Sequence, residues 1–262
     1  MKQFDTLALS SRGPALILTI NQPKSLNALA QEVVNDLEAF VDWFETTGFE
    51  YRGVIITGAG EKSFVAGANI VQMNAMDAQQ ALAYGRQMHS VTERLESLQV
   101  PVIAAVNGFA LGGGCEIALA CDFIYASENA SFGQPEVNLG LVPGFGGSVR
   151  LPRRVGNAMA RELIFTGRRI KSAEALRIGL ANRVVPAGEL IDQAVAAIEE
   201  IAAVSPTAVA NAKSALVAMD ALNTHDALLV EADSFQRAFT TNDSLEGRAA
   251  FVEKRSPNFP GN

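Results

Sequence analysis

The segment that decides the fold is residues 100–117, which read VPVIAAVNGFALGGGCEI. Val102 to Val106 is a short apolar run, which is typical of a strand buried on both faces of a parallel sheet. The glycine triplet Gly112 to Gly114 follows and opens an apolar helix. A buried strand, a glycine turn and a helix in this order predict an α/β fold.

Two carboxylates stand out because their neighbours are apolar. Glu116 comes directly after the glycine triplet, inside the apolar run Cys115 to Ala120. Glu136 lies in a second notable segment, residues 131–150 (SFGQPEVNLGLVPGFGGSVR), where it follows a proline. Charged side chains are rare in such surroundings unless they are paired or functional. Two structural alternatives stay open: Glu116 as a buried residue paired with an arginine, and Glu136 as a surface carboxylate in a turn.

The pattern of strand, loop and helix repeats along the first part of the chain and predicts mostly parallel strands. Strands are expected within 4–20 (two strands turning at 11–14), at 54–57 and at 123–125, and helices at 28–47 and 77–98.

After residue 150 the pattern becomes helical, with 182–185 as the single expected strand. This helical layer could pack on the sheet, on another subunit or on both. Helices are expected at 157–166, 172–178, 188–204, 206–220, 224–240 and 243–254.

Composition limits the classes of function. A chain of 262 residues with 48% hydrophobic residues has ample apolar material for a core and a cleft, and a net charge of −7 argues against nucleic acid as the main partner. The spacing of Cys115 and Cys121 suits neither a metal site nor a disulfide, so a reducing compartment is expected. The first residues lack an apolar signal core and no apolar run could span a bilayer. We expect a soluble, cytoplasmic protein with no membrane association.

Two small-residue turns could form an anion site. A helix that begins at the glycine triplet has free backbone N–H groups at the positive end of its dipole. Ala66-Gly67-Ala68 is a second such turn, between a buried strand and a helix start. Two such turns can each aim one N–H at the same oxygen, as in an oxyanion hole. The alternative is two tightly packed turns without a ligand.

The two glutamates beside such a site could move a proton on and off a carbon next to a carbonyl, or orient a water. Other chemistries fit the sequence poorly. The segments 58–63 and 144–147 lack glycines that phosphate and dinucleotide loops need, and Ser148 lacks the glycine of a nucleophile elbow. His89 and His225 lie on separate expected helices and make no zinc set with the two cysteines, so no metal is expected.

At these residues the sequence resembles the enoyl-CoA hydratase (crotonase) superfamily over essentially the whole chain. The resembling segments are Pro23–Leu29, Phe64–Ile70, Gly112–Glu116, Phe132–Glu136, Pro143–Gly147 with Arg150-Leu151, and Phe251–Arg255.

The resemblance implies a fold and a site. The fold would be a spiral of ββα turns over residues 1–200 with a helical trimerisation region over 201–262, in a trimer or a dimer of trimers. Within the site, backbone N–H groups would hold the thioester oxygen, one glutamate would activate water and the other would protonate the α-carbon. The implied residues are Ala68 and Gly113 (oxyanion hole), Glu116 (water), Glu136 (α-carbon), Gly144 (beside the water), Lys24, Ala66 and Ala68 (CoA path), and Phe251 and Lys254 (closure of the CoA site, in the same or a neighbouring subunit).

The implied activity is hydration of a 2-enoyl-CoA to a 3-hydroxyacyl-CoA, as in fatty-acid β-oxidation, with no cofactor beyond the coenzyme A of the substrate. A CoA-thioester double-bond isomerase on the same scaffold is the nearest alternative, and a non-catalytic acyl-CoA- or RNA-binding scaffold is an alternative of another class. The sequence departs from the family pattern at Asn69, usually aspartate, at Val71, often lysine, and at Ser148-Val149, commonly Thr-Gln.

Overall fold

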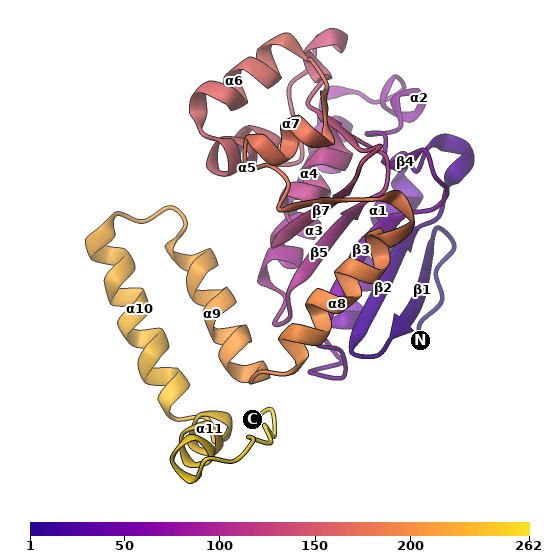
Figure 1. Ribbon diagram of the computed structural model, residues 1–262. Coiled ribbons are helices and arrows are strands. Elements are labelled where there is room, and N and C mark those ends of the chain that lie inside the picture. Colours follow the sequence, from indigo (N-terminus) through magenta and orange to yellow (C-terminus); the bar gives the residue numbers. More distant parts are fainter.

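The computed structural model describes residues 1–262 and contains two sheets (Figure 1). The larger sheet is six-stranded with the order β1-β2-β3-β5-β7-β10. Only β1 and β2 pair antiparallel, and every other neighbour in this sheet is parallel. Its strands are β1 (Leu7–Arg12), β2 (Ala15–Ile20), β3 (Gly53–Gly58), β5 (Val102–Val106), β7 (Phe123–Ser127) and β10 (Arg183–Val185).

A smaller four-stranded sheet has the order β4-β6-β8-β9. From β3 to β8 successive strands alternate between the two sheets, so each of these three turns of the chain gives one strand to each sheet before a helix follows. This is the spiral of ββα turns that the family resemblance implies. The sequence analysis missed this sheet because its strands are two or three residues long, too short for a recognisable alternation. The strands are β4 (Ser63–Val65), β6 (Phe109–Leu111), β8 (Ser131–Gly133) and β9 (Ile170–Lys171).

The helices agree with the expected segments apart from α5 and apart from α2, for which only a helix start after Ala68 was expected. The expectation missed α5, whose first residue follows a glycine, Gly146, that offers no side-chain cap. Asp77 caps α3 in a capping box with Gln80, Ser205 caps α9 and Thr241 caps α11. The helices are α1 (Gln31–Phe44), α2 (Ile70–Met73), α3 (Ala78–Ser97), α4 (Gly113–Leu119), α5 (Gly147–Val155), α6 (Asn157–Thr166), α7 (Ser172–Arg177), α8 (Leu190–Ala202), α9 (Pro206–Met219), α10 (Thr224–Phe239) and α11 (Asn242–Glu253).

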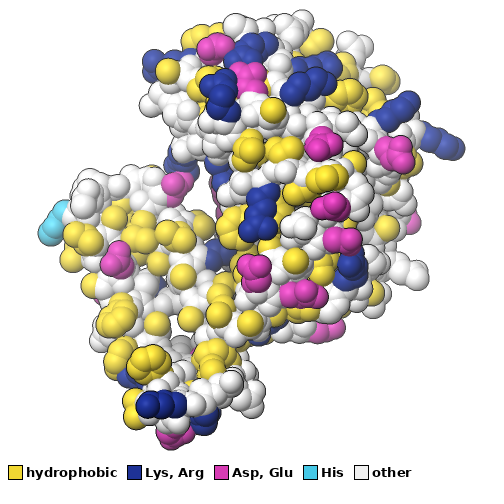
Figure 2. Space-filling view, viewed as in Figure 1, with side chains coloured by type: hydrophobic (Ala, Val, Ile, Leu, Met, Phe, Trp, Pro, Cys, Tyr) yellow, Lys and Arg dark blue, Asp and Glu magenta, His cyan; other side chains and the backbone are white.

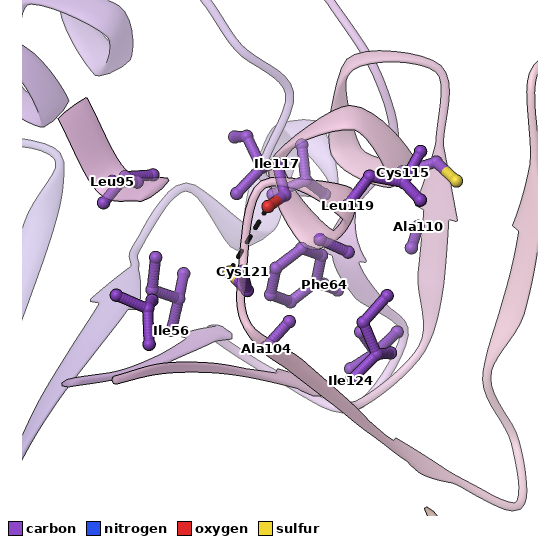
Figure 3. Close-up of a cluster of buried hydrophobic side chains, with 14 of the residues drawn as sticks. Ile56, Phe64, Leu95, Ala104, Ala110, Cys115, Ile117, Leu119, Cys121 and Ile124 are labelled. Atoms are coloured by element: carbon purple, nitrogen blue, oxygen red, sulfur yellow. Dashed lines mark hydrogen bonds between the residues drawn. The ribbon is translucent and has the colours of Figure 1, made fainter. Parts of the chain in front are cut away.

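The larger sheet is buried on both faces because its strands carry apolar residues at consecutive positions. In β2, Leu16 and Leu18 face the main core, whereas Ile17 faces a second cluster formed with α8. The site helix α4 lies over the main core: Ile117 and Leu119 share one cluster with Phe64 of β4 (Figure 3). The helix that carries Glu116 therefore rests on a closely packed base.

The last three helices, α9 to α11, extend from the end of α8 and form a C-terminal arm (Figure 1). One buried cation ties the arm to the core. Lys213 of α9 bonds Asp122 Oδ2 at 2.7 Å and the carbonyl oxygen of Val100 at 3.0 Å. No single helix is long and apolar enough to cross a membrane, and only α8 with α9, bent by 108° between them, meets the criterion of length and composition as a pair.

Candidate active site

One cleft brings together most of the residues that the sequence suggested. It is a cavity of about 170 Å³ at the junction of α2, α4 and the loop before α5. Predicted site residues in its lining are Ala66, Ala68, Gly113, Glu116, Glu136 and Gly144.

The turn after β4 is held in a conformation that needs glycine. Gly67 has φ +110°, and a Cβ there would lie 3.3 Å from the carbonyl oxygen of Leu111. The carbonyl oxygen of Gly67 accepts from the N–H of Leu29 at 2.8 Å, which fixes the turn to the start of α1. Asn69 caps α2 through the N–H of Gln72 at 3.2 Å, so an asparagine serves well at this departure from the family pattern.

The glycine triplet is required by close approach of other groups. A Cβ on Gly114 would lie 2.0 Å from the carbonyl oxygen of Val65, and a Cβ on Gly113 would lie 2.8 Å from the ring of Phe145. Gly112 has φ +49°, and a Cβ there would be 3.9 Å from the Cα of Gly67, so the two turns are neighbours. At Gly114 the obstructing atom belongs to the backbone, so this position has room for glycine alone, whereas at Gly113 a Cβ would displace side chains.

The backbone N–H groups of Ala68 and Gly113 donate to no group of the chain. Gly113 is the first residue of α4, where N–H groups lack intrahelical acceptors and the helix dipole is positive. Two free donors on neighbouring turns, both lining the cleft, make an anion site available.

Glu116 is 1% exposed and accepts two backbone hydrogen bonds. Its Oε1 accepts from the N–H of Phe145 at 2.8 Å and from the N–H of Gly147 at 2.7 Å. It is not paired with an arginine, because Arg150 instead bonds both oxygens of Glu96 at 2.7 and 2.6 Å. Burial raises the pKa of Glu116 to about 7, although the two N–H donors act in the opposite direction. A carboxyl with this pKa changes charge near neutral pH.

This raised pKa predicts a pH-dependent cost in stability. The folded state binds the Glu116 proton more tightly than the unfolded state, so stability contributed by the neutral carboxyl is present below the unfolded value of 4.5 and is lost as pH rises towards about 7. Glu116→Gln removes this loss and should raise the free energy of unfolding at pH 8 by roughly 2–4 kcal/mol, with little difference at pH 4. Urea unfolding at both pH values and one protein concentration checks this. Equal stability of both proteins at pH 8 would show that burial does not penalise the Glu116 charge.

Glu136 lies at the start of a short 3₁₀ helix, Glu136–Leu139, that lines the opposite side of the cleft. Its Oε1 would be 2.9 Å from a Cβ on Gly112, so the carboxylate lies against the glycine turn. Burial raises the pKa of Glu136, and its own backbone N–H lowers it less. The carboxyl is half-buried and lines the cleft, unlike the surface turn carboxylate of the structural alternative.

Gln134 is a site residue that the sequence analysis missed. It is fully buried, and with its amide nitrogen turned towards Glu136 it donates to Oε1 at 2.8 Å and to Oε2 at 3.2 Å. The signal available in the sequence was an amide directly before Pro135-Glu136. Because the structure buries this amide, it needs a hydrogen-bond partner.

Gln134→Leu removes a donor that favours the ionised form of Glu136, so the pKa of Glu136 should rise further. We expect the limb of the pH–rate profile assigned to Glu136 to move to higher pH. Turnover should fall roughly tenfold because the carboxyl loses its orientation. Gln134→Glu tests the same position with a side chain of equal length. An unshifted profile in both variants would assign Gln134 to packing alone.

Three predicted residues lie elsewhere in the single chain. Lys24 is exposed in a short 3₁₀ helix, Pro23–Ser25, beside a separate cavity of about 350 Å³. Phe251 and Lys254 are exposed at the end of α11, on the C-terminal arm and away from the cleft. No cluster of three or more His, Cys, Asp or Glu side chains is arranged to hold a metal ion.

Together, the cleft offers two free N–H donors and two carboxyls with raised pKa in apolar surroundings. This set can stabilise an oxyanion while protons move at neighbouring atoms.

Comparison with known proteins agrees with this geometry. Residues 13–262 match the family model described as enoyl-CoA hydratase/isomerase. The chain is 46% identical to a short-chain-enoyl-CoA hydratase of Clostridium acetobutylicum, covering 97% of both chains. It is 43% identical to a crotonyl-CoA hydratase of Syntrophomonas wolfei, covering 98% of both. It also superposes on a crystal structure of an enoyl-CoA hydratase from Bacillus anthracis with a TM-score of 0.94, at 38% identity and covering 98% of this chain and all of the other. The chain therefore belongs to the enoyl-CoA hydratase/isomerase family, within the crotonase superfamily.

Proposed function

We propose that this protein is a 2-enoyl-CoA hydratase, which adds water reversibly to a 2-trans-enoyl-CoA and gives a 3-hydroxyacyl-CoA. One observation carries the proposal: two carboxyls with raised pKa values line the cleft that also contains two unpaired backbone N–H groups. The similarity to proteins named as enoyl-CoA hydratases supports the same reaction.

In the proposed mechanism the thioester oxygen accepts hydrogen bonds from the N–H groups of Ala68 and Gly113. Glu116, in its ionised form, takes a proton from a water beside Gly144, and the water oxygen bonds to the β-carbon. The π electrons move towards the thioester oxygen, where the two donors stabilise the growing negative charge. Glu136, in its protonated form, then gives its proton to the α-carbon on the same face, which makes the addition syn. Glu116 then releases its proton and Glu136 takes one up from solvent, so the net addition is one water and the reaction needs no cofactor beyond the coenzyme A of the substrate.

The isomerase alternative uses the same oxyanion site without adding water. Presenting the purified protein with a 2-enoyl-CoA and, separately, with a 3-enoyl-CoA distinguishes the two. A hydratase converts the 2-enoyl-CoA to a product heavier by one water, whereas an isomerase interconverts the two substrates at constant mass. Migration of the double bond without hydration would contradict the proposal.

A non-catalytic scaffold predicts binding without turnover. RNA binding is disfavoured by the net charge of the protein, −7, because a negative protein repels the phosphates of RNA. A gel shift with RNA beside a titration with an acyl-CoA compares these ligands directly. We expect acyl-CoA binding and no shift of RNA, and RNA binding without turnover would favour the scaffold.

The coenzyme A path is proposed to run along the cavity beside Lys24. Ser63 lines this cavity and belongs to the same chain segment as Ala66, which lines the cleft. Lys62, which lines that cavity, provides a cation for the CoA phosphates. Val71 is 84% exposed and provides no charge at the position where the family pattern often has a lysine. Because Phe251 and Lys254 are remote from the cleft of their own chain, we propose that they close the CoA site of a neighbouring subunit.

A trimer, alone or as a dimer of trimers, is proposed from the surface of the C-terminal arm. Apolar side chains gather over this arm (Figure 2), and Ser234 is the one buried residue of α10. Large exposed apolar surfaces on helices mark contact with another protein. The large exposed apolar side chains of the arm are Leu216, Val217, Leu222, Leu228, Leu229, Phe235, Phe239, Leu245, Phe251 and Val252.

Sedimentation velocity tests the assembly. We expect the mass of three or six chains, and Phe235→Asp on α10 should release smaller species by placing a charge in the interface. Phe165→Asp on α6 is the matched control, since both rings are about equally exposed in the single chain, at 73% and 69%. A monomeric wild-type protein would contradict the assembly and leave the hydratase proposal standing.

A further inference from the structure

The cleft has an open end and a buried end. At the open end its apolar lining is exposed, and these residues are Ile70, Leu139, Leu141 and Val142. Leu111 and Phe145 are the large apolar side chains of the lining that are buried, and Met73 of α2 is half-buried. Phe145 lies beside both catalytic groups, because a Cβ on Gly113 would be 2.8 Å from its ring and its N–H donates to Glu116 Oε1. An acyl group held by the N–H of Gly113 therefore meets the ring of Phe145.

Phe145 is held on both sides. Its N–H bonds Glu116 Oε1 at 2.8 Å, and its carbonyl oxygen accepts from Arg150 at 3.2 Å. Its ring packs edge-on against Tyr84, with ring centres 5.0 Å apart and an angle of 84° between the planes. The hydroxyl of Tyr84 donates to the carbonyl oxygen of Leu29 at 2.6 Å, which fixes the second ring in turn. Aromatic pairs of this geometry resist displacement.

No other large cavity adjoins the ring pair of Phe145 and Tyr84. Tyr84 and Met88 are buried on the unbroken helix α3 and belong to the main core. A Cβ on Gly85 would lie 3.4 Å from the carbonyl oxygen of Gly144, so α3 packs directly on the turn that carries Phe145. None of the other large cavities touches Tyr84 or Phe145.

We propose that Phe145, braced by Tyr84, closes the inner end of the acyl cavity and restricts the enzyme to short-chain 2-enoyl-CoA substrates. This inference rests on the proposed function. The cavity of about 170 Å³ is smaller than the ~300–1,000 Å³ typical of ligand pockets. It holds an acyl group of a few carbons, and each further methylene meets the ring of Phe145 in place of open space.

The test is the ratio of kcat/KM for a ten-carbon 2-enoyl-CoA to that for crotonyl-CoA. In the wild type the ratio should be well below one, because a methylene that does not fit an apolar pocket lowers kcat/KM by roughly tenfold or more. Phe145→Ala opens the inner end and should raise the ratio at least ~10-fold. The ratio isolates chain length from any general loss of activity, which matters because Phe145 lies beside Glu116.

Two further variants keep the test decisive. Phe145→Leu serves if the alanine variant does not fold, and it should raise the ratio in the same direction by a smaller factor. Phe165→Ala, at an exposed ring of α6 outside the cleft lining, is the matched control and should leave the ratio unchanged. A wild type equally active on both chains, or a shift in the control without a shift at Phe145, would overturn the inference. A wild type that hydrates neither substrate would instead overturn the proposed function.

Discussion

Glu136→Gln should lower kcat for hydration of crotonyl-CoA by at least ~10²–10⁴-fold, the range in which general acid–base catalysis contributes. The amide has the size of the carboxyl and can accept the same backbone contacts, yet it has no proton to deliver to the α-carbon. Acyl-CoA affinity should change little, because the N–H donors of Ala68 and Gly113 are untouched. Steady-state kinetics and calorimetric titration with a saturated acyl-CoA measure the two quantities.

Glu128→Gln is the control for this substitution, because Glu128 is exposed directly after β7 and is not among the residues that line the cleft. We expect wild-type turnover from it. Retention of full turnover by Glu136→Gln would contradict the acid role. Loss of folded structure in the same variant, seen by circular dichroism, would assign Glu136 a structural role instead.

Gly113→Pro should lower kcat by roughly 10²–10³-fold more than Gly113→Ala, the effect of removing one oxyanion donor. Both variants place a Cβ against the ring of Phe145, where it would lie at 2.8 Å, so both share the cost of that contact. Only proline removes the N–H. Proline is tolerated at the first position of a helix, which is the position of Gly113 in α4.

The alanine variant is therefore the matched control for the proline variant. The comparison is made on kcat at saturating crotonyl-CoA, with thermal unfolding measured for both proteins. Equal kcat for the two variants would show that the N–H of Gly113 does not contact the thioester oxygen. If neither variant folds, the corresponding test is made on the other proposed donor, the N–H of Ala68.

The larger sheet and most helices were predictable because their signals are local. Val102 to Val106 is apolar throughout, as a strand buried on both faces must be, and Asp77 caps α3 through its own side chain. The smaller sheet was not predictable, since β4, β6 and β8 have three residues each and are defined by pairing with distant segments. The glycine before α5 likewise gave no capping signal.

The candidate site likewise contains residues that could be predicted from the sequence and residues that could not. Glu116 and Glu136 were identifiable because a carboxylate among apolar residues is unusual in any sequence. The partners of Glu116 were not, because they are the backbone N–H groups of Phe145 and Gly147, and a backbone donor leaves no mark in the residue type. The role proposed for Phe251 requires a neighbouring copy of the chain, because the residue lies away from the cleft of its own chain. The departure at Ser148-Val149 falls on exposed residues of the first turn of α5, and nothing in the structure explains it.

The most direct test of the central claim mixes the purified protein with crotonyl-CoA in ¹⁸O-labelled water. The absorbance of the conjugated thioester is followed and the product is identified by mass. The account predicts rapid loss of absorbance and a product that has gained one labelled water. Unchanged absorbance, while the crotonyl-CoA remains bound to the protein, would contradict hydration and leave only the fold and a thioester-binding cleft.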